Sequence, residues 1–317
     1  MAAAPNGFLL LDKPAGWSSH RVVSRVRKWL GTRKVGHAGT LDPMATGVLV
    51  VGVGPSTRLL TFAVGLGKTY TATIRLGAST PTDDADSAPD RFAQADRLAA
   101  LDLERIEGAL GSLRGDILQR PSAVSAIKVD GRRAYARVRA GEDVELDARP
   151  VTVSRFDVVS ALRSSTAVAE DGAEHGVVDV DVVVDCSSGT YVRALARDLG
   201  DALGAFGHLT ALRRTRVGDF PIDEALTVPD FDAHAPVPEL ITPAAAAAAL
   251  LPTIEVSAEQ AVQLRQGRFL AQSAFSAPAA PEPYAAISGA ERGEHGELVA
   301  VLDRRDDSFK SRVVFPA

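Results

Sequence analysis

The segment of residues 35–54, VGHAGTLDPMATGVLVVGVG, constrains the fold of this chain more than any other. Its first part is a loop punctuated by glycine and proline, and its second part is an apolar run typical of a buried strand. One carboxylate, Asp42, lies in the loop just before that run. Polar groups are thus concentrated where the chain must turn tightly and enter a core, which is typical of a functional loop on a rigid scaffold.

The length and composition indicate a globular protein with a substantial core. The chain has 317 residues, of which 46% are hydrophobic, enough for one large domain and a small appended one. Its single cysteine, Cys186, excludes an intrachain disulfide and a cysteine-based zinc cage, and it favours a reducing compartment. No apolar run approaches the ~18 residues of a membrane span, and the run at residues 8–11 is too short for a signal sequence. We therefore expect a soluble, cytoplasmic protein.

The net charge of −5 argues only weakly against a nucleic-acid partner, because the basic residues are clustered. Residues 20–37 hold six lysines and arginines and no acid. Two further clusters consist of Arg132, Arg133, Arg137 and Arg139, and of Arg213, Arg214 and Arg216. A phosphate backbone senses such local charge, so the overall acidity does not exclude an RNA partner. Taken singly, each cluster is equally typical of a solvated helix face.

Apolar periodicity predicts the main secondary structure. Ser18 or Ser19 is expected to cap a helix whose apolar side comprises Val22, Val23, Val26, Trp29 and Leu30. Strict alternation over residues 68–76 predicts a half-buried strand with Tyr70 on its core face. Residues 151–162 and 177–185 are predicted to form an antiparallel hairpin with a long polar loop at 163–176, and residues 104–110, 192–203 and 259–266 are predicted to be helical.

These elements do not alternate as β-α-β units, so we predict an α+β fold with a mixed or antiparallel sheet flanked by helices. Six consecutive alanines at residues 244–249 predict a short helix that closes the main domain, because alanine is the best helix former. The chain is therefore expected to divide into a main domain, 1–250, and a small β-rich module, 251–317, with strands at residues 298–302 and 310–314.

Asp42 is the sharpest catalytic candidate, although an aspartate between leucine and proline is more often a simple turn residue. A second segment, DCSSGTYVRALARD at residues 185–198, strengthens the hypothesis. Thr190 is expected to start a helix there, with Arg193 in the first turn, where the helix dipole disfavours a cation. An arginine at that position is favoured if an anion faces it, and pairing with a buried carboxylate would keep that acid ionised and correctly oriented. Otherwise an exposed arginine on a surface helix is the better interpretation.

Both segments closely resemble the catalytic motifs of the TruB family, the bacterial tRNA pseudouridine synthases that act on uridine 55 of the T loop. Further resemblances, in the family's order, are LDKPAG at 11–16, KTYTATIRLG at 68–77, TDDAD at 82–86, PSAVSAIKVDGRRAYARVR at 121–139, ARPVTV at 148–153 and LRRTRVGDF at 212–220. Each motif is weak alone, but their order makes coincidence implausible. The resemblance implies a pseudouridine-synthase-type sheet and a C-terminal PUA-like RNA-binding module.

The resemblance also implies roles for individual residues. Asp42 corresponds to the catalytic aspartate, Tyr70 to the aromatic residue that stacks on the target base, and Arg193 to the ion-pair partner of Asp42, with Asp84 as a possible second partner. The residues expected to contact the substrate or support its site are His37, Tyr191, Leu212 and Lys13. Phosphate contacts are expected from Arg132, Arg133, Arg137 and Arg213.

This chain departs from the family pattern in two places. Ser122 and Val124 stand where many members carry proline and tyrosine, which puts aromatic support of the site by this segment in doubt. The segment 163–176 is longer than in comparable members, and we expect it to be a mobile surface loop with no inferred role.

Pseudouridine formation breaks the bond between ribose C1′ and uracil N1, turns the base and joins C5 to C1′. The reaction needs no metal, redox cofactor or group donor, and the sequence lacks metal-ligand spacing and nucleotide-binding glycine motifs. A carboxylate suits either proposed route, as a nucleophile or as a base on a ribose proton. We therefore expect an enzyme without cofactors that acts on tRNA as a monomer, with no obligatory protein partner.

Two other functions remain open. A non-catalytic tRNA-binding protein or folding chaperone would use the same basic surface but would not need the pair of Asp42 and Arg193. A glycosidase-like hydrolase would need a second carboxylate, for which Asp84 is the nominal candidate, but no sugar-binding aromatic cluster accompanies it.

Overall fold

The computed structural model describes residues 4–122, 128–129, 132–133, 146–228, 236, 238–275, 281–289 and 296–316, with backbone only at 128–129 and 132–133. The chain divides into two compact units. One contains Met1–Leu41, Val48–Leu66 and Val217–Ala317, and the other contains Asp42–Gly47 and Gly67–Arg216. The candidate catalytic residues Asp42, Tyr70 and Arg193 all belong to the second unit, as does Asp84, the second predicted partner of Arg193.

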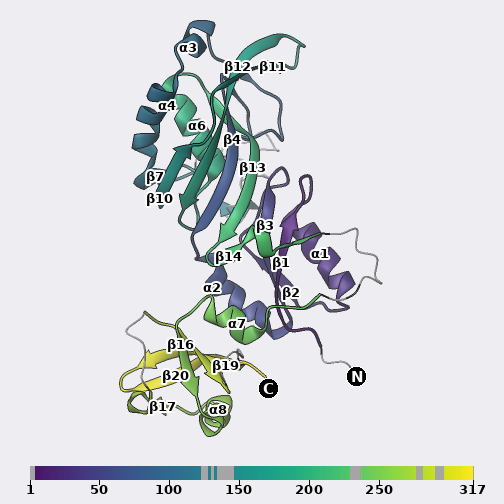
Figure 1. The fold of residues 1–317 in the computed structure, drawn as a ribbon, viewed down its shortest axis with the longest axis vertical. Helices are drawn as coiled ribbons and strands as arrows, with labels where there is room; N and C mark the ends of the chain where they lie inside the picture. The colour runs from purple at the N-terminus through teal and green to yellow at the C-terminus, as the bar shows by residue number, and fades with distance from the viewer. Residues whose placement is uncertain are drawn as a thin grey trace. The chain divides into compact units, whose positions relative to one another are not determined.

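The second unit is built on a sheet with the strand order β13-β4-β12-β10-β7. Its strands are β4 (Lys68–Leu76), β7 (Gly115–Gln119), β10 (Arg149–Val158), β12 (Glu174–Cys186) and β13 (Gly207–Val217). The pairs β4-β12, β10-β12 and β7-β10 are antiparallel. Helices α4 (Leu103–Leu110) and α6 (Val192–Leu203) contact each other, and both contact this sheet (Figure 1). The α+β prediction is confirmed.

The smaller elements of this unit lie between those strands. They are β5 (Ala78–Ser79), β6 (Arg91–Phe92), α3 (Ala95–Ala99), η2 (Gly111–Leu113), β8 (Lys128–Val129), β9 (Arg132–Arg133) and β11 (Arg163–Val168). The prediction of a mobile loop at 163–176 is wrong, because β11 pairs antiparallel with β12 over its whole length. The serines and threonine of β11 made this strand difficult to predict, because the alternation of apolar and polar residues is weak when both faces of an edge strand are solvated.

The first unit contains a second group of strands, in the order β15-β1-β3, with β2 paired to β3. The bounds are β1 (Gly7–Lys13), β2 (Val35–Ala38), β3 (Thr46–Val53) and β15 (Leu226–Thr227). The predicted helix is α1 (Ser19–Trp29), and the Ser18 side chain accepts a hydrogen bond from the Arg21 amide as its N-cap. Its apolar side packs on Leu9, Leu11 and the core face of β3, as the helical spacing predicted.

The C-terminal residues of the first unit form a five-stranded sheet in the order β16-β18-β19-β20-β17. Its strands are β16 (Thr253–Val256), β17 (Leu270–Ala271), β18 (Tyr284–Ser288), β19 (Glu297–Arg305) and β20 (Ser308–Val314), and α8 (Ala258–Arg265) packs on β19 and β20. The β-rich character of this module is therefore confirmed.

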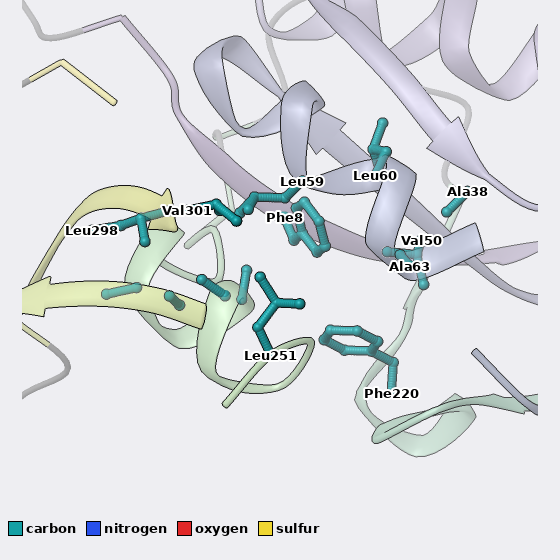
Figure 2. Packing of buried hydrophobic residues seen from close by; sticks show 14 of the residues in the cluster. Phe8, Ala38, Val50, Leu59, Leu60, Ala63, Phe220, Leu251, Leu298 and Val301 are labelled. Carbon is teal, nitrogen blue, oxygen red and sulfur yellow. The ribbon is translucent and has the colours of Figure 1, made fainter. Parts of the chain in front are cut away.

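The predicted alanine-rich helix is α7 (Pro243–Ala248), and it contributes to a core shared by the module and the N-terminal part of the same unit. Figure 2 shows Leu298 and Val301 of β19 on one side of this cluster, with Phe8 and Leu59 beside them. The remaining elements of the unit are η1 (Gly54–Leu59), α2 (Leu60–Val64), β14 (Phe220–Pro221), η3 (Ile222–Glu224) and η4 (Gln272–Ala274). The division of the chain at residue 250 stays a prediction.

Candidate active site

Asp42 begins a tight turn, and its side chain is directed at an arginine. Its backbone carbonyl accepts a hydrogen bond from the Ala45 amide at 3.1 Å, so the main chain closes the turn. The carboxylate Oδ2 lies 3.0 Å from Arg193 Nε, and the Asp42 side chain remains 39% exposed. The carboxylate is thus held on one side and accessible on the other.

Arg193 is the buried member of this pair, with 5% of its side chain exposed. Its Nη1 lies 3.3 Å from Oδ2 of Asp84 and donates to the Thr82 carbonyl at 2.7 Å. The expected ion pair with Asp42 and the second pair with Asp84 are both present. The deeply buried carboxylate of this network is that of Asp84, at 2% exposure.

The Asp84 carboxylate is fixed by its own loop. Its Oδ1 accepts hydrogen bonds from the Thr82 hydroxyl at 2.6 Å and from the Asp86 amide at 3.0 Å. Its other oxygen is left to face Arg193. The guanidinium therefore bridges a rigid buried anion and an accessible one, which restrains the orientation of Asp42.

The start of α6 differs from the prediction. Tyr191, not Thr190, is the N-cap residue, and its side chain makes no capping hydrogen bond. Thr190 instead donates its hydroxyl to the Ser187 carbonyl at 3.0 Å. The buried amide of Gln119, at the end of β7, clamps the Tyr191 backbone: it accepts from the Tyr191 amide at 2.8 Å and donates to the Tyr191 carbonyl at 3.0 Å. Nothing local in the sequence marked Gln119, because its partner lies far along the chain.

Tyr70 lies on the core face of β4, as predicted, and only 7% of it is exposed. Burial raises the pKa of its phenol, whereas the Arg214 side chain, which hydrogen-bonds the phenol, acts to lower that pKa. The phenol is therefore neutral at physiological pH and is held in place by a cation. Burial and the Arg214 guanidinium also lower the pKa of Lys68, at the start of the same strand, to about 8.

Strand β13 supplies Leu212 and the arginine cluster that follows it. Leu212 is buried, and its carbonyl accepts from the Thr46 hydroxyl at 3.5 Å, while Arg213 Nη1 donates to the same hydroxyl oxygen at 3.4 Å. Arg214 is only 1% exposed. The interpretation of 213–216 as one phosphate-binding cluster is therefore wrong for Arg214, whose side chain is buried within the unit and hydrogen-bonds the Tyr70 phenol.

His37 and Lys13 belong to the other compact unit. The ring of His37, on β2, meets that of His20 edge to face, with centroids 5.6 Å apart. Lys13 is fully buried at the end of β1, where its ammonium donates to the carbonyls of Pro14 at 2.9 Å and Trp17 at 2.7 Å. It thus fixes the turn that leads into α1.

Several predicted residues fall where the structure describes little or nothing. Arg132 and Arg133 form β9, which pairs with β8, but their side chains lie outside the described part of the chain, as do Arg137 and Val124. Ser122 is buried. Within the described ranges, no group of three or more His, Cys, Asp or Glu side chains is placed to hold a metal ion, and no helix is long and apolar enough to span a membrane.

Comparisons with known proteins show the family of this chain. Residues 27–192 match the TruB family pseudouridylate synthase N-terminal domain, and residues 193–251 match the tRNA pseudouridylate synthase B C-terminal domain. The tRNA pseudouridine synthase B of Arthrobacter sp. (strain FB24) is 52% identical over 314 residues, which cover 98% of this chain and 96% of the relative. That of Cutibacterium acnes (strain DSM 16379 / KPA171202) is 53% identical over 308 residues, which cover 97% and 96%.

Solved structures share the fold. An H/ACA RNP bound to a substrate RNA containing 2′-deoxyuridine matches with a TM-score of 0.69 and 23% identity, over 98% of this chain and 85% of that one. A Cbf5-Nop10-Gar1 complex matches with a TM-score of 0.65 and 25% identity, over 93% and 77%. The family matches and the relatives thus define the class of protein as a pseudouridylate synthase, and the fold agrees with that class. Within that class, the chain belongs to the TruB family.

Proposed function

We propose that this protein isomerises uridine 55 in the T loop of tRNA to pseudouridine. The observation that carries the proposal is the pair of Asp42 and Arg193, in which a buried guanidinium holds an accessible carboxylate at 3.0 Å. The names of the relatives, tRNA pseudouridine synthase B, support tRNA as the substrate. Binding alone would not require an ion pair of this geometry.

In the proposed reaction, the target nucleotide leaves the stacked loop and its base enters the site. Flipping costs a few kcal/mol, which stacking and phosphate contacts must offset. Tyr70 provides the stacking surface, and its phenol is held in place by Arg214. Tyr191, Leu212 and His37 contact the flipped uridine or its loop, and Lys13 fixes the turn that supports the site.

Asp42 then acts on the ribose, either by adding to C1′ as a nucleophile or by removing a ribose proton as a base. The C1′–N1 bond breaks, the base turns, and a bond forms between C1′ and C5. N1 gains a proton and C5 loses its hydrogen to solvent, so no other reactant is consumed. Arg193 keeps the carboxylate aimed throughout because its own position is fixed by Asp84 and Thr82.

The remaining contacts bind the RNA. Arg213 and the segment with Arg132, Arg133 and Arg137 contact phosphates of the T arm, since a folded hairpin is recognised mainly through its backbone and splayed bases. The C-terminal module is a PUA-like domain that adds RNA contacts. The protein acts in the cytoplasm as a monomer without a metal or organic cofactor.

Tritium release from a tRNA transcript labelled with [5-³H]uridine tests this function directly, because isomerisation replaces the C5 hydrogen. We expect the wild-type protein to release tritium without metal or nucleotide, and a transcript with cytidine at position 55 to give none. Asp42→Asn should lower the single-turnover rate by ~10³ or more, with little change in tRNA affinity. Wild-type protein that binds tRNA but releases no tritium would indicate a tRNA-binding protein or chaperone instead.

A further inference from the structure

Helix α6 carries a second arginine one turn after Arg193, and it engages the residue next to Asp84. Positions four apart lie on the same face of a helix. Arg197 Nη1 lies 3.2 Å from Asp83 Oδ2, with 23% and 13% of the two side chains exposed. Two successive carboxylates thus bind two arginines on successive turns of one helix.

This arrangement depends on an unusual backbone conformation. In extended chain, neighbouring side chains point in opposite directions. Asp83 instead adopts a φ of 57°, in the left-handed region that non-glycine residues seldom occupy. Its amide donates to the Thr80 carbonyl and its carbonyl accepts from the Leu209 amide, each at 3.1 Å. The turn is therefore held from both sides, and strain of this kind persists only where the surroundings fix it.

Arg197 is itself fully engaged. Its Nε and Nη2 donate to Asp198 Oδ1 at 3.0 and 2.8 Å, and Nη2 also donates to the Arg120 carbonyl at 2.8 Å. Burial raises the pKa of Asp83, while Arg197 and Arg193 act to lower it. Removing Arg197 would leave the largely buried carboxylate of Asp83 without its ion-pair partner, whereas removing Asp83 would leave Arg197 bound to Asp198 and the Arg120 carbonyl.

We infer that Asp83 and Arg197 are positioning residues for the reaction: they fasten the turn at residues 82–84 to α6 and so hold Arg193 against Asp42. The connection is short, because Arg193 donates to the Thr82 carbonyl and faces Asp84, the residues on either side of Asp83. The inference rests on the proposed function, since it concerns the rate of that reaction.

Asp83→Asn is the primary test, because asparagine has nearly the same volume and tolerates a positive φ. We expect the single-turnover rate constant of pseudouridine formation to fall about tenfold, with tRNA affinity and the final amplitude unchanged. A merely structural role would lower the folded fraction, measured by circular dichroism, and would leave the rate constant at saturating protein unchanged. Arg197→Gln should give a similar fall, and the double variant should be no slower than the slower single variant.

Asp179→Asn is the matched control. Asp179 pairs with Arg75 at 2.8 Å, with exposures of 14% and 23%, on the face of β4 opposite to Tyr70. It should keep the wild-type rate constant. The inference would be overturned if Asp83→Asn and Arg197→Gln both kept the wild-type rate constant, or if the control lost as much rate as they did. In either case, activity of the wild-type protein would still support the proposed function. If Asp83→Asn does not fold, Arg197→Gln decides. Absence of pseudouridine with wild-type protein would overturn the function itself and, with it, this inference.

Discussion

Arg193 and Asp42 form an asymmetric ion pair: the arginine is 5% exposed and the aspartate 39%. The cation is fixed in the interior by Asp84 and the Thr82 carbonyl, whereas the anion reaches the surface of its unit. Such a pair fixes the orientation of the Asp42 carboxylate but adds little to the stability of the fold, because an exposed carboxylate is well solvated without a partner. The arrangement suits a group that must act on a substrate from a fixed direction.

Arg193→Lys tests that orientation. Lysine keeps the charge, but a single ammonium cannot reproduce the planar contacts of Nε with Asp42 and of Nη1 with Asp84 and Thr82. We expect single-turnover pseudouridine formation to slow by about 100-fold with little change in tRNA affinity. Arg75→Lys, which changes an arginine of another ion pair in the same unit, is the control and should stay near the wild-type rate. A rate within twofold of wild type in Arg193→Lys would show that charge alone suffices.

Gly47→Ala should destabilise the protein, because the backbone of β13 leaves no room for a side chain. A Cβ at Gly47 would lie 2.1 Å from the Arg214 carbonyl oxygen, and the glycine also has a φ of 106°. We expect a loss of about 2 to 4 kcal/mol in the free energy of unfolding, measured by urea denaturation. Gly172→Ala is the control for backbone strain alone, since it has a φ of 85° and nothing within 4 Å of the new Cβ. Equal losses in the two variants would contradict the proposed clash.

Lys68 should make stability rise with pH over a narrow window. Its pKa is about 8 in the folded protein and 10.5 for the free side chain, so above pH 8 the folded chain has lost a proton that the unfolded chain still binds. Stability should therefore increase, by at most ~1.4 kcal/mol per pH unit. The Cys186 thiol acts in the opposite sense above pH 9, because burial raises its pKa from 9.0 to about 11.

The net rise is thus expected between pH 8 and pH 9, and urea unfolding at these two values measures it. Lys68→Met should abolish the rise, and Lys34→Met, which alters an exposed lysine, should retain it. A rise of the same size in Lys68→Met would assign the effect to another group.

The basic segment around β9 should set the salt dependence of tRNA binding. Replacing Arg132, Arg133 and Arg137 with glutamine should flatten the log-log salt slope by ~0.9 for each duplex phosphate that the variant no longer neutralises. The control replaces Arg155, Arg163 and Arg312, which are paired with Asp157, Asp181 and Asp303. It changes the net charge equally but should leave the slope intact. Filter binding across a salt series measures the slope for both variants. An unchanged slope in the first variant would indicate that these arginines lie on an ordinary solvated surface and do not contact phosphates.

The sequence by itself determined most of the local structure near the site. Alternation over Lys68–Leu76 predicted β4 with its observed bounds and placed Tyr70 inward, and a serine cap with helical spacing predicted α1. These signals are local, because burial of one face imposes a period on neighbouring residues. The pairing of Asp42 with Arg193 was implied by the resemblance of their motifs to the TruB family.

Only the tertiary structure decided which groups complete the site. Leu212, Arg214 and Arg216 lie two residues apart along one strand, yet Arg214 is buried beside the Tyr70 phenol while Arg216 is exposed. The clamp from Gln119 and the pair of Asp83 with Arg197 likewise join segments far apart in the chain. A residue's type and spacing encode its own conformation, but its partner is fixed by long-range register, which no local pattern records.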